Sequence, residues 1–211
     1  MPRIIECTLV TDGSSDKMLI APVSWCLEQL FPEHVVSIQF ADLRQHIGKD
    51  RSLSTRITLG LNLYPCDLLF IHRDAEGETY EDRLTEINEA VAQAGTIDVP
   101  FVPVIPVRMS EAWLLHDAKA IRTAAGNPNG SMNLSLPFAG QVHKLSDPKA
   151  VLEELLIIAT GNNKRRRKKF QPRREMHRIA ELISDFSVLQ ADPSFQKLQA
   201  ALEEFRFTLF L

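Results

Sequence analysis

Residues 66–77 read CDLLFIHRDAEG, an apolar run (66–71) followed at once by polar and charged residues. A strand with one face in water alternates apolar and polar side chains, whereas a strand covered on both faces reads as a continuous apolar run. The run therefore predicts a strand in the middle of a sheet. Such strands are typical of parallel sheets, whose crossover helices cover both faces.

Outward from this strand, strands and helices alternate along the chain. Further strands are predicted at residues 4–11 (IIECTLVT), 35–40 and 99–107, and the prolines at 100, 103 and 106 place the last at an edge or a bent end. Helices are predicted at 18–30, at 42–62 with a softer stretch near 48–54, at 78–94, and from Glu111 onward after a capping Ser110. This order predicts an α/β fold with a mostly parallel four-stranded sheet flanked by helices.

The rest of the chain predicts a helical extension. Residues 126–147 are rich in Gly, Asn, Ser and Pro and favour a loop or lid, and helices follow at 148–159, 175–185 and 193–205. We expect an α/β domain over 1–125, the loop or lid over 126–147, and a helical extension over 148–211 that carries a basic loop at 164–174. Trp113 and Phe195 are most simply core residues.

Composition excludes several classes of protein. With 211 residues, 45% of them apolar and 24% charged, the chain has the balance of a folded globular protein and is not disordered as a whole. No stretch approaches the roughly 18 apolar residues of a membrane span, and the N-terminus lacks the features of a signal peptide. The three scattered cysteines stand in apolar settings, so we expect buried thiols in a reducing cytoplasm.

The net charge of −3 hides a strongly basic segment. Residues 164–178 hold nine basic residues and one acidic residue, a net charge of +8 that leaves −11 for the rest of the chain. This segment favours contact with nucleic-acid phosphates, and a solvated loop or a dock for an acidic partner protein are the alternatives. Because neighbouring charges repel, we expect a loop here. The candidate substrate-binding residues are Lys164, Arg165, Arg166, Arg167, Lys168, Lys169, Arg173 and Arg174, together with Arg73 beyond the central strand.

Acidic residues follow three of the predicted strands. They are Asp12 and Asp16, Asp74 and Glu76, and Glu111. Ligands of doubly wound sheets lie outside the carboxyl ends of the strands, and carboxylates gathered there suit Mg²⁺ or Mn²⁺ and phosphoryl chemistry. Each also has a structural interpretation, as a turn residue, a helix cap, a polar loop or a helix-dipole partner.

Several of these motifs resemble a known family. Asp12-Gly13-x-x-Asp16 resembles the Glu-Gly-x-x-Asp signature of TOPRIM domains, and Asp74-x-Glu76 resembles their Asp-x-Asp. The segments IHRDAE (71–76) and SEAWLL (110–115) are similar to the bacterial TOPRIM-like family catalogued as domain of unknown function 4276, as are LSDPK (145–149) and PSF (193–195). The likeness covers most of the chain.

The resemblance implies a set of roles. In TOPRIM nucleases, including those of the overcoming-lysogenization-defect type, the acidic residues bind Mg²⁺ and the first-strand glutamate serves acid–base chemistry. Carried over, it implies Asp12 for that glutamate, Asp74 and Glu76 as metal ligands, Glu111 as an added ligand and Asp16 in support. Asp12 is one methylene shorter and Glu76 one longer than the family pattern. This puts the acid–base role of Asp12 in question more than the metal site.

Two functional hypotheses follow. The first is a nuclease that depends on Mg²⁺ or Mn²⁺ and cleaves DNA or RNA, as the effector of a phage-defence system with an AAA or ABC-type ATPase partner, which the resemblance implies. The second is a non-catalytic subunit with a degenerate TOPRIM site that binds nucleic acid or the ATPase. A small-molecule phosphohydrolase is a weaker alternative, because it would have little use for six consecutive basic residues. Beside Asp74, His72 could orient a water and Arg73 could clamp a phosphate, or one packs at the strand end and the other is solvated.

Overall fold

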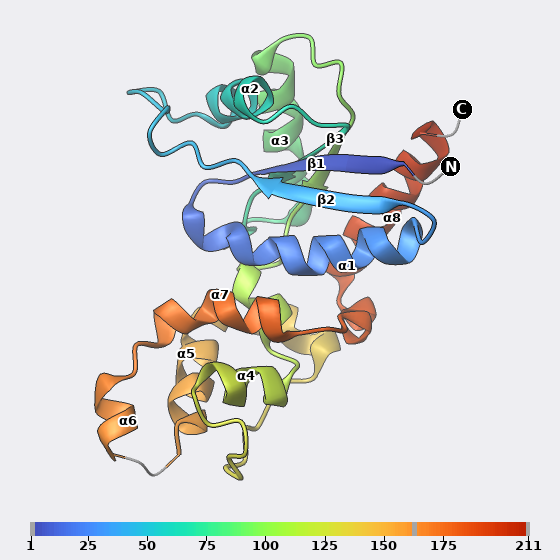
Figure 1. Ribbon diagram of the computed structural model, residues 1–211. Coiled ribbons are helices and arrows are strands. Elements are labelled where there is room, and N and C mark those ends of the chain that lie inside the picture. Colours follow the sequence, from blue (N-terminus) through green and yellow to red (C-terminus); the bar gives the residue numbers. More distant parts are fainter. Residues whose placement is uncertain (1–2, 162–163, 210–211) are drawn as a thin grey trace.

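The computed structural model describes residues 3–161 and 164–209, and its centre is a single parallel sheet (Figure 1). Within these residues the strand order is β2-β1-β3-β4, and every neighbouring pair is parallel. The strands are β1 (Ile4–Val10), β2 (Val35–Phe40), β3 (Leu68–His72) and β4 (Phe101–Val104). The α/β fold predicted from the alternation of strands and helices is confirmed.

The register brings the carboxyl ends of the strands to one edge. Leu9 of β1 lies opposite Phe40 of β2, and Val10 lies opposite Ile71 of β3. The last pair of the sheet joins His72 to Val104. The loops after β1, β3 and β4 therefore start side by side, which positions the candidate site.

Helices cover both faces of the sheet, as the apolar run in β3 predicts. On one face lie α2 (Leu53–Leu63) and α3 (Tyr80–Ala94), and on the other lie α1 (Ile20–Leu30) and α8 (Pro193–Leu209) (Figure 1). Side chains of β3 alternate between the two cores. Leu69 and Ile71 join the α2–α3 core, and Leu68 and Phe70 join the α1–α8 core.

The remaining helices form a group on the far side of α1 (Figure 1). They are α4 (Ala118–Ala124), α5 (Pro148–Ala159), α6 (Lys164–Lys169) and α7 (Pro172–Leu182). Short 3₁₀ turns occur elsewhere in the fold, and they are η1 (Ser14–Leu19), η2 (Ser110–Leu114), η3 (Ala139–Lys144) and η4 (Ser187–Ala191). Trp113 and Phe195 are fully buried with their rings edge to face at 5.2 Å, which confirms them as core residues. One hydrophobic core runs from the sheet through these rings into α5 and α7.

The helix predicted at 42–62 is wrong for its first half. The helix begins only at Leu53, and a loop precedes it. Aspartate side chains stabilise this loop, since Asp42 accepts from the backbone N–H of Arg44 and Asp50 from that of Ser52. Such local hydrogen bonds compete with helix formation.

The α-helix predicted after a capping Ser110 is also wrong. Residues 110–114 form a short 3₁₀ turn, and the α-helix starts at Ala118 with Asp117 as its N-cap. The hydroxyl of Ser110 donates instead to the carboxylate of Asp74, 3.0 Å away. The hydroxyl of Ser110, which the sequence predicts as a helix cap, therefore forms a hydrogen bond with a residue distant in sequence.

The basic segment is helical where a loop is expected. Lys164–Lys169 forms α6, and only residues 170–171 separate it from α7. Successive side chains of a helix point about 100° apart, and like charges in water cost only a few tenths of a kcal/mol per pair. The side chains of Lys164 and Arg166 lie outside the described part of the structure, and the exposed members are Arg165, Arg167, Lys168 and Lys169.

Two further expectations concern membranes and cysteines. In the described part of the chain, no helix combines the length and apolar character needed to cross a membrane. The cysteines carry free thiols, with Cys7 and Cys26 buried and Cys66 half-buried. Burial raises the pKa of both Cys7 and Cys26 to about 12, so these two thiols behave as small apolar side chains.

Candidate metal centre at the carboxyl edge of the sheet

The predicted site residues separate onto the two faces of the sheet. His72 and Asp74 lie on the α1 side, where they meet Asp16 of η1. Arg73 lies on the α3 side and pairs with Asp12. Strand alternation continues through these positions, so neighbours in sequence become members of two different clusters.

His72 is the central side chain of the first cluster, and it is 2% exposed. Its Nδ1 lies 2.9 Å from the carbonyl oxygen of Val104. A carbonyl only accepts, so Nδ1 carries a proton and donates. The other nitrogen, Nε2, faces Asp74 Oδ1 at 3.5 Å and Asp16 Oδ2 at 3.9 Å. A backbone carbonyl that fixes the ring in this way is common where histidine binds a metal ion.

Two hydrogen-bond networks hold the carboxylates in place. Asp16 Oδ2 accepts from the backbone N–H of Gly13 at 3.2 Å, and Asp16 Oδ1 accepts from the hydroxyl of Ser15 at 3.1 Å. Asp74 Oδ1 accepts from Ser110, whose hydroxyl also lies 3.4 Å from His72 Nε2. Both carboxylates therefore present fixed oxygens toward the same imidazole nitrogen.

The electrostatics of Asp74 show that this cluster lacks positive charge. Burial is the largest cause that raises the pKa of Asp74, and the carboxylates of Asp16 and Glu111 add to the rise. His72 and Ser110 oppose it, and the resulting pKa is about 6. A buried carboxylate beside other carboxylates is stabilised by a proton or by a cation. A cation bound at this cluster would therefore stabilise the ionised form of Asp74.

The donor atoms fit a divalent cation. One atom each of Asp16, His72 and Asp74 lies within 4.8 Å of the other two. Ligand distances of about 2.0–2.2 Å require donors about 3–4 Å apart, so the observed separations need only small side-chain movements. Imidazole with two carboxylates suits Mn²⁺ and other transition metals better than Mg²⁺, which prefers oxygen ligands alone.

His72 was not predicted as a metal ligand from the sequence. Strand alternation could have indicated it, because residues 72 and 74 fall on the same face when the chain stays extended. The predicted added ligand, Glu111, lies close enough to affect Asp74 but has its own counterion. Its buried carboxylate pairs with Lys149 Nζ at 3.4 Å, a partner that the sequence analysis did not identify.

The structure does not bring Asp12 and Glu76 to the Asp16–His72–Asp74 cluster. Asp12 pairs with Arg73 and lies 3.7 Å from Arg56 Nε. Glu76 lies 3.7 Å from Arg83 and has a backbone φ of +53°, a conformation uncommon for a residue with a side chain. Both carboxylates therefore already have arginine counterions.

The predicted basic contacts lie in two places. Arg73 is held in ion pairs with Asp12 and Glu86. Arg173 pairs with Glu153 at 2.8 Å, and Arg174 is exposed. In Figure 1, α7 lies between α6 and η1, so the basic helix is set apart from the carboxyl edge.

Comparison of the chain with protein-family models, with curated proteins and with solved structures finds no match.

Proposed function

We propose that this chain is a metal-dependent phosphodiester hydrolase, a nuclease whose divalent cation is held by Asp16, His72 and Asp74. The observation that carries the proposal is the orientation of His72, whose Nε2 faces two carboxylates while its Nδ1 is fixed by a carbonyl. This donor set favours Mn²⁺. The TOPRIM-like resemblance supports the proposal at Asp16 and Asp74 and differs from it at Asp12 and Glu76.

The residues around the cluster have distinct tasks in this proposal. The Gly13 N–H and the Ser15 hydroxyl orient Asp16, and Ser110 orients Asp74. When bound, a divalent cation supplies positive charge to a phosphoryl oxygen and activates water for attack on phosphorus. Asp74 is the most exposed of the three candidate ligands, with 25% of its side chain accessible, so it faces the side from which substrate enters.

Nucleic acid is the favoured substrate because exposed positive charge extends from α6 into the start of α7. Such side chains contact phosphates without regard to sequence, and their contribution falls steeply as salt rises. The described and exposed members are Arg165, Arg167, Lys168, Lys169 and Arg174.

The test is cleavage of single-stranded and double-stranded DNA and RNA with Mn²⁺, comparing wild type with Asp74→Asn. Removing a carboxylate ligand is expected to lower the cleavage rate at least 100-fold, an order typical of a lost electrostatic partner in catalysis. The matched control is Asp98→Asn, which changes an exposed aspartate just before β4, at the opposite edge of the sheet. Equal cleavage by Asp74→Asn and wild type would contradict the assignment.

A second candidate function is a non-catalytic subunit that binds nucleic acid or an ATPase. The observation that favours it is the pairing of Asp12 and Glu76 with arginines, since these are the positions to which the resemblance assigns chemistry. It predicts salt-sensitive nucleic-acid binding that survives Asp74→Asn but not the double reversal Arg165→Glu with Arg167→Glu. An ATPase partner and a role in phage defence stay predictions from the resemblance.

A further inference from the structure

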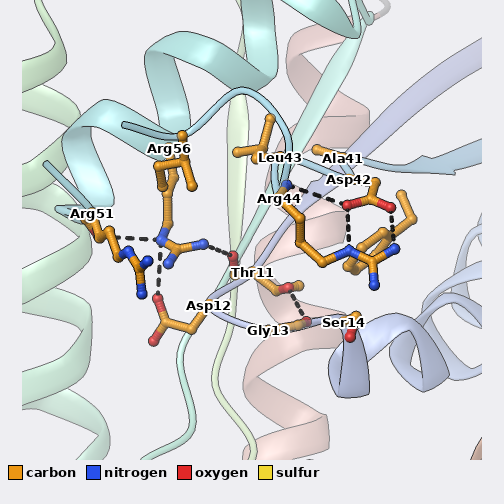
Figure 2. A pocket seen from close by; sticks show the side chains of 12 residues that line it. Thr11, Asp12, Gly13, Ser14, Ala41, Asp42, Leu43, Arg44, Arg51 and Arg56 are labelled. Carbon is orange, nitrogen blue, oxygen red and sulfur yellow. Dashed lines mark hydrogen bonds and ion pairs between the residues drawn. The ribbon is translucent and has the colours of Figure 1, made fainter. Parts of the chain in front are cut away.

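A pocket of about 310 Å³ opens beside the carboxyl ends of β1 and β2, outside the Asp16–His72–Asp74 cluster (Figure 2). Its walls are the loop after β1, the segment after β2 and the start of α2. Three arginines from these segments line it. They are Arg44, Arg51 and Arg56.

The pocket has more positive charge than its own carboxylates neutralise. Arg44 is held by Asp42 through two hydrogen bonds of 2.8 and 2.5 Å. The other acidic wall residue, Asp12, is shared with Arg73, which does not line the pocket. Among the described residues, the guanidinium of Arg51 has no hydrogen bond or ion pair.

Arg56 adds a second cation in a fixed position. Its Nη1 donates to the carbonyl of Thr11 at 3.2 Å, and its Nε donates to the carbonyl of Arg51 at 3.2 Å. The same Nε lies 3.7 Å from Asp12 Oδ1, and Arg73 shares that carboxylate. Burial lowers the pKa of Arg56, and the neighbouring charge of Arg51 lowers it further. Figure 2 shows the two guanidiniums together on one side of the pocket and that of Arg44 on the other. An anion bound beside Arg51 and Arg56 would relieve the repulsion between their two positive charges.

The remaining wall of the pocket is apolar, which indicates that the bound anion carries an apolar group. Phe40 and Ile47 are half-buried and Leu43 is buried, and all three line the same pocket. A free inorganic anion would leave this surface unused, whereas an aromatic base packs well against a phenylalanine ring. Guanidinium groups bind phosphate oxygens through paired N–H donors.

We propose that this pocket binds the phosphate monoester of a nucleotide, with Arg44, Arg51 and Arg56 around the phosphate and the base against Phe40. The ligand is either a free mononucleotide or the 5′-phosphorylated end of a strand, since both present the same chemistry. The loop of residues 11–16 separates the pocket from the metal cluster and contributes to both, because Gly13 lines the pocket and donates to Asp16.

The test is calorimetric titration of the full chain in EDTA with 5′-AMP, adenosine and a 5′-phosphorylated dinucleotide. EDTA keeps the metal cluster out of the measurement, so failure here is distinct from failure of the proposed nuclease activity. Arg51→Ala is the informative variant because Arg51 is exposed, so the substitution is expected to leave the packing of the fold unchanged. Arg206→Ala removes an equal charge from an exposed position on α8 and is the control.

Wild type and Arg206→Ala are expected to bind 5′-AMP at least tenfold more tightly than adenosine, and Arg51→Ala is expected to weaken 5′-AMP binding roughly tenfold. Weaker binding of the dinucleotide than of 5′-AMP identifies a free nucleotide as the ligand, and equal or stronger binding of the dinucleotide identifies a strand end. The proposal is overturned if 5′-AMP does not bind, if it binds no better than adenosine, or if Arg51→Ala leaves its affinity unchanged.

Discussion

Replacing Asp74 by asparagine is expected to stabilise the metal-free protein, although it removes a proposed ligand. Asp74 is a buried carboxylate close to Asp16 and Glu111, and its pKa is raised from 3.8 to about 6. Asparagine keeps the size of the side chain and an oxygen that can accept from Ser110. The substitution removes only the negative charge, which destabilises the folded protein when no cation is bound at the cluster.

The magnitude follows from the pKa. A difference of about two pH units corresponds to about 3 kcal/mol at ~1.4 kcal/mol per unit, and the 25% exposure of the side chain reduces this to about 2–3 kcal/mol. The folded protein keeps the proton up to about pH 6, whereas the unfolded chain releases it near pH 3.8. Stability of the wild type therefore falls as pH rises through this window, and the asparagine variant does not share that loss.

The assay is urea unfolding in EDTA at pH 7 and at pH 3.5. The free energy of unfolding of Asp74→Asn is expected to exceed that of wild type by about 2–3 kcal/mol at pH 7, with little difference at pH 3.5. Asp12→Asn is the matched control with the opposite sign, because Asp12 has Arg73 as a counterion and its loss is expected to destabilise. A destabilised Asp74→Asn at pH 7 would refute the claim that the cluster lacks positive charge.

Two further predictions concern packing and charge, and both are measured by chemical unfolding. Gly60→Ala is expected to cost about 1–3 kcal/mol, because the new Cβ would lie 2.6 Å from Val10 Cγ2 where α2 meets β1, and an unchanged stability would contradict that close approach. Lys149→Ala is expected to destabilise more than Glu111→Gln, because it leaves the buried Glu111 carboxylate without its counterion, and the reverse order would contradict the assigned pairing.

Much of the fold could be predicted because local patterns and packing agree. The apolar run in β3 requires cover on both faces, and the structure provides it with helices on each side. The helix at Pro148–Ala159 begins where its signals predict, with Asp147 as the cap and proline in the first turn. These features depend on residues near each other in sequence, or on burial alone.

The secondary-structure predictions that the structure overturns concern side chains with competing hydrogen-bond partners. Residues 42–52 carry aspartates that bond to nearby backbone groups, so the loop is as consistent with the sequence as a helix. Ser110 has the properties of a cap but donates to Asp74, which is 36 positions away. No local pattern distinguishes these outcomes.

The structure brings together only part of the predicted acidic set at the carboxyl edge of the sheet. The sequence brings acidic residues to the ends of β1 and β3, and the structure places Asp16 and Asp74 together as expected from parallel strands. The sequence does not show that Arg73 pairs with Asp12, because Asp12 lies in the loop after β1, where strand alternation no longer fixes the direction of a side chain. His72 could have been recognised from alternation with Asp74.

The most direct test of the metal assignment is calorimetric titration of Mn²⁺ into wild type, Asp74→Asn and Asp12→Asn. We expect one Mn²⁺ per chain for wild type and for Asp12→Asn, and at least a tenfold loss of affinity for Asp74→Asn. Asp74→Asn and Asp12→Asn each remove one carboxylate charge from the same edge of the sheet, so general electrostatics affects them alike. Wild-type affinity in Asp74→Asn, or loss of binding in Asp12→Asn alone, would contradict a site built from Asp16, His72 and Asp74.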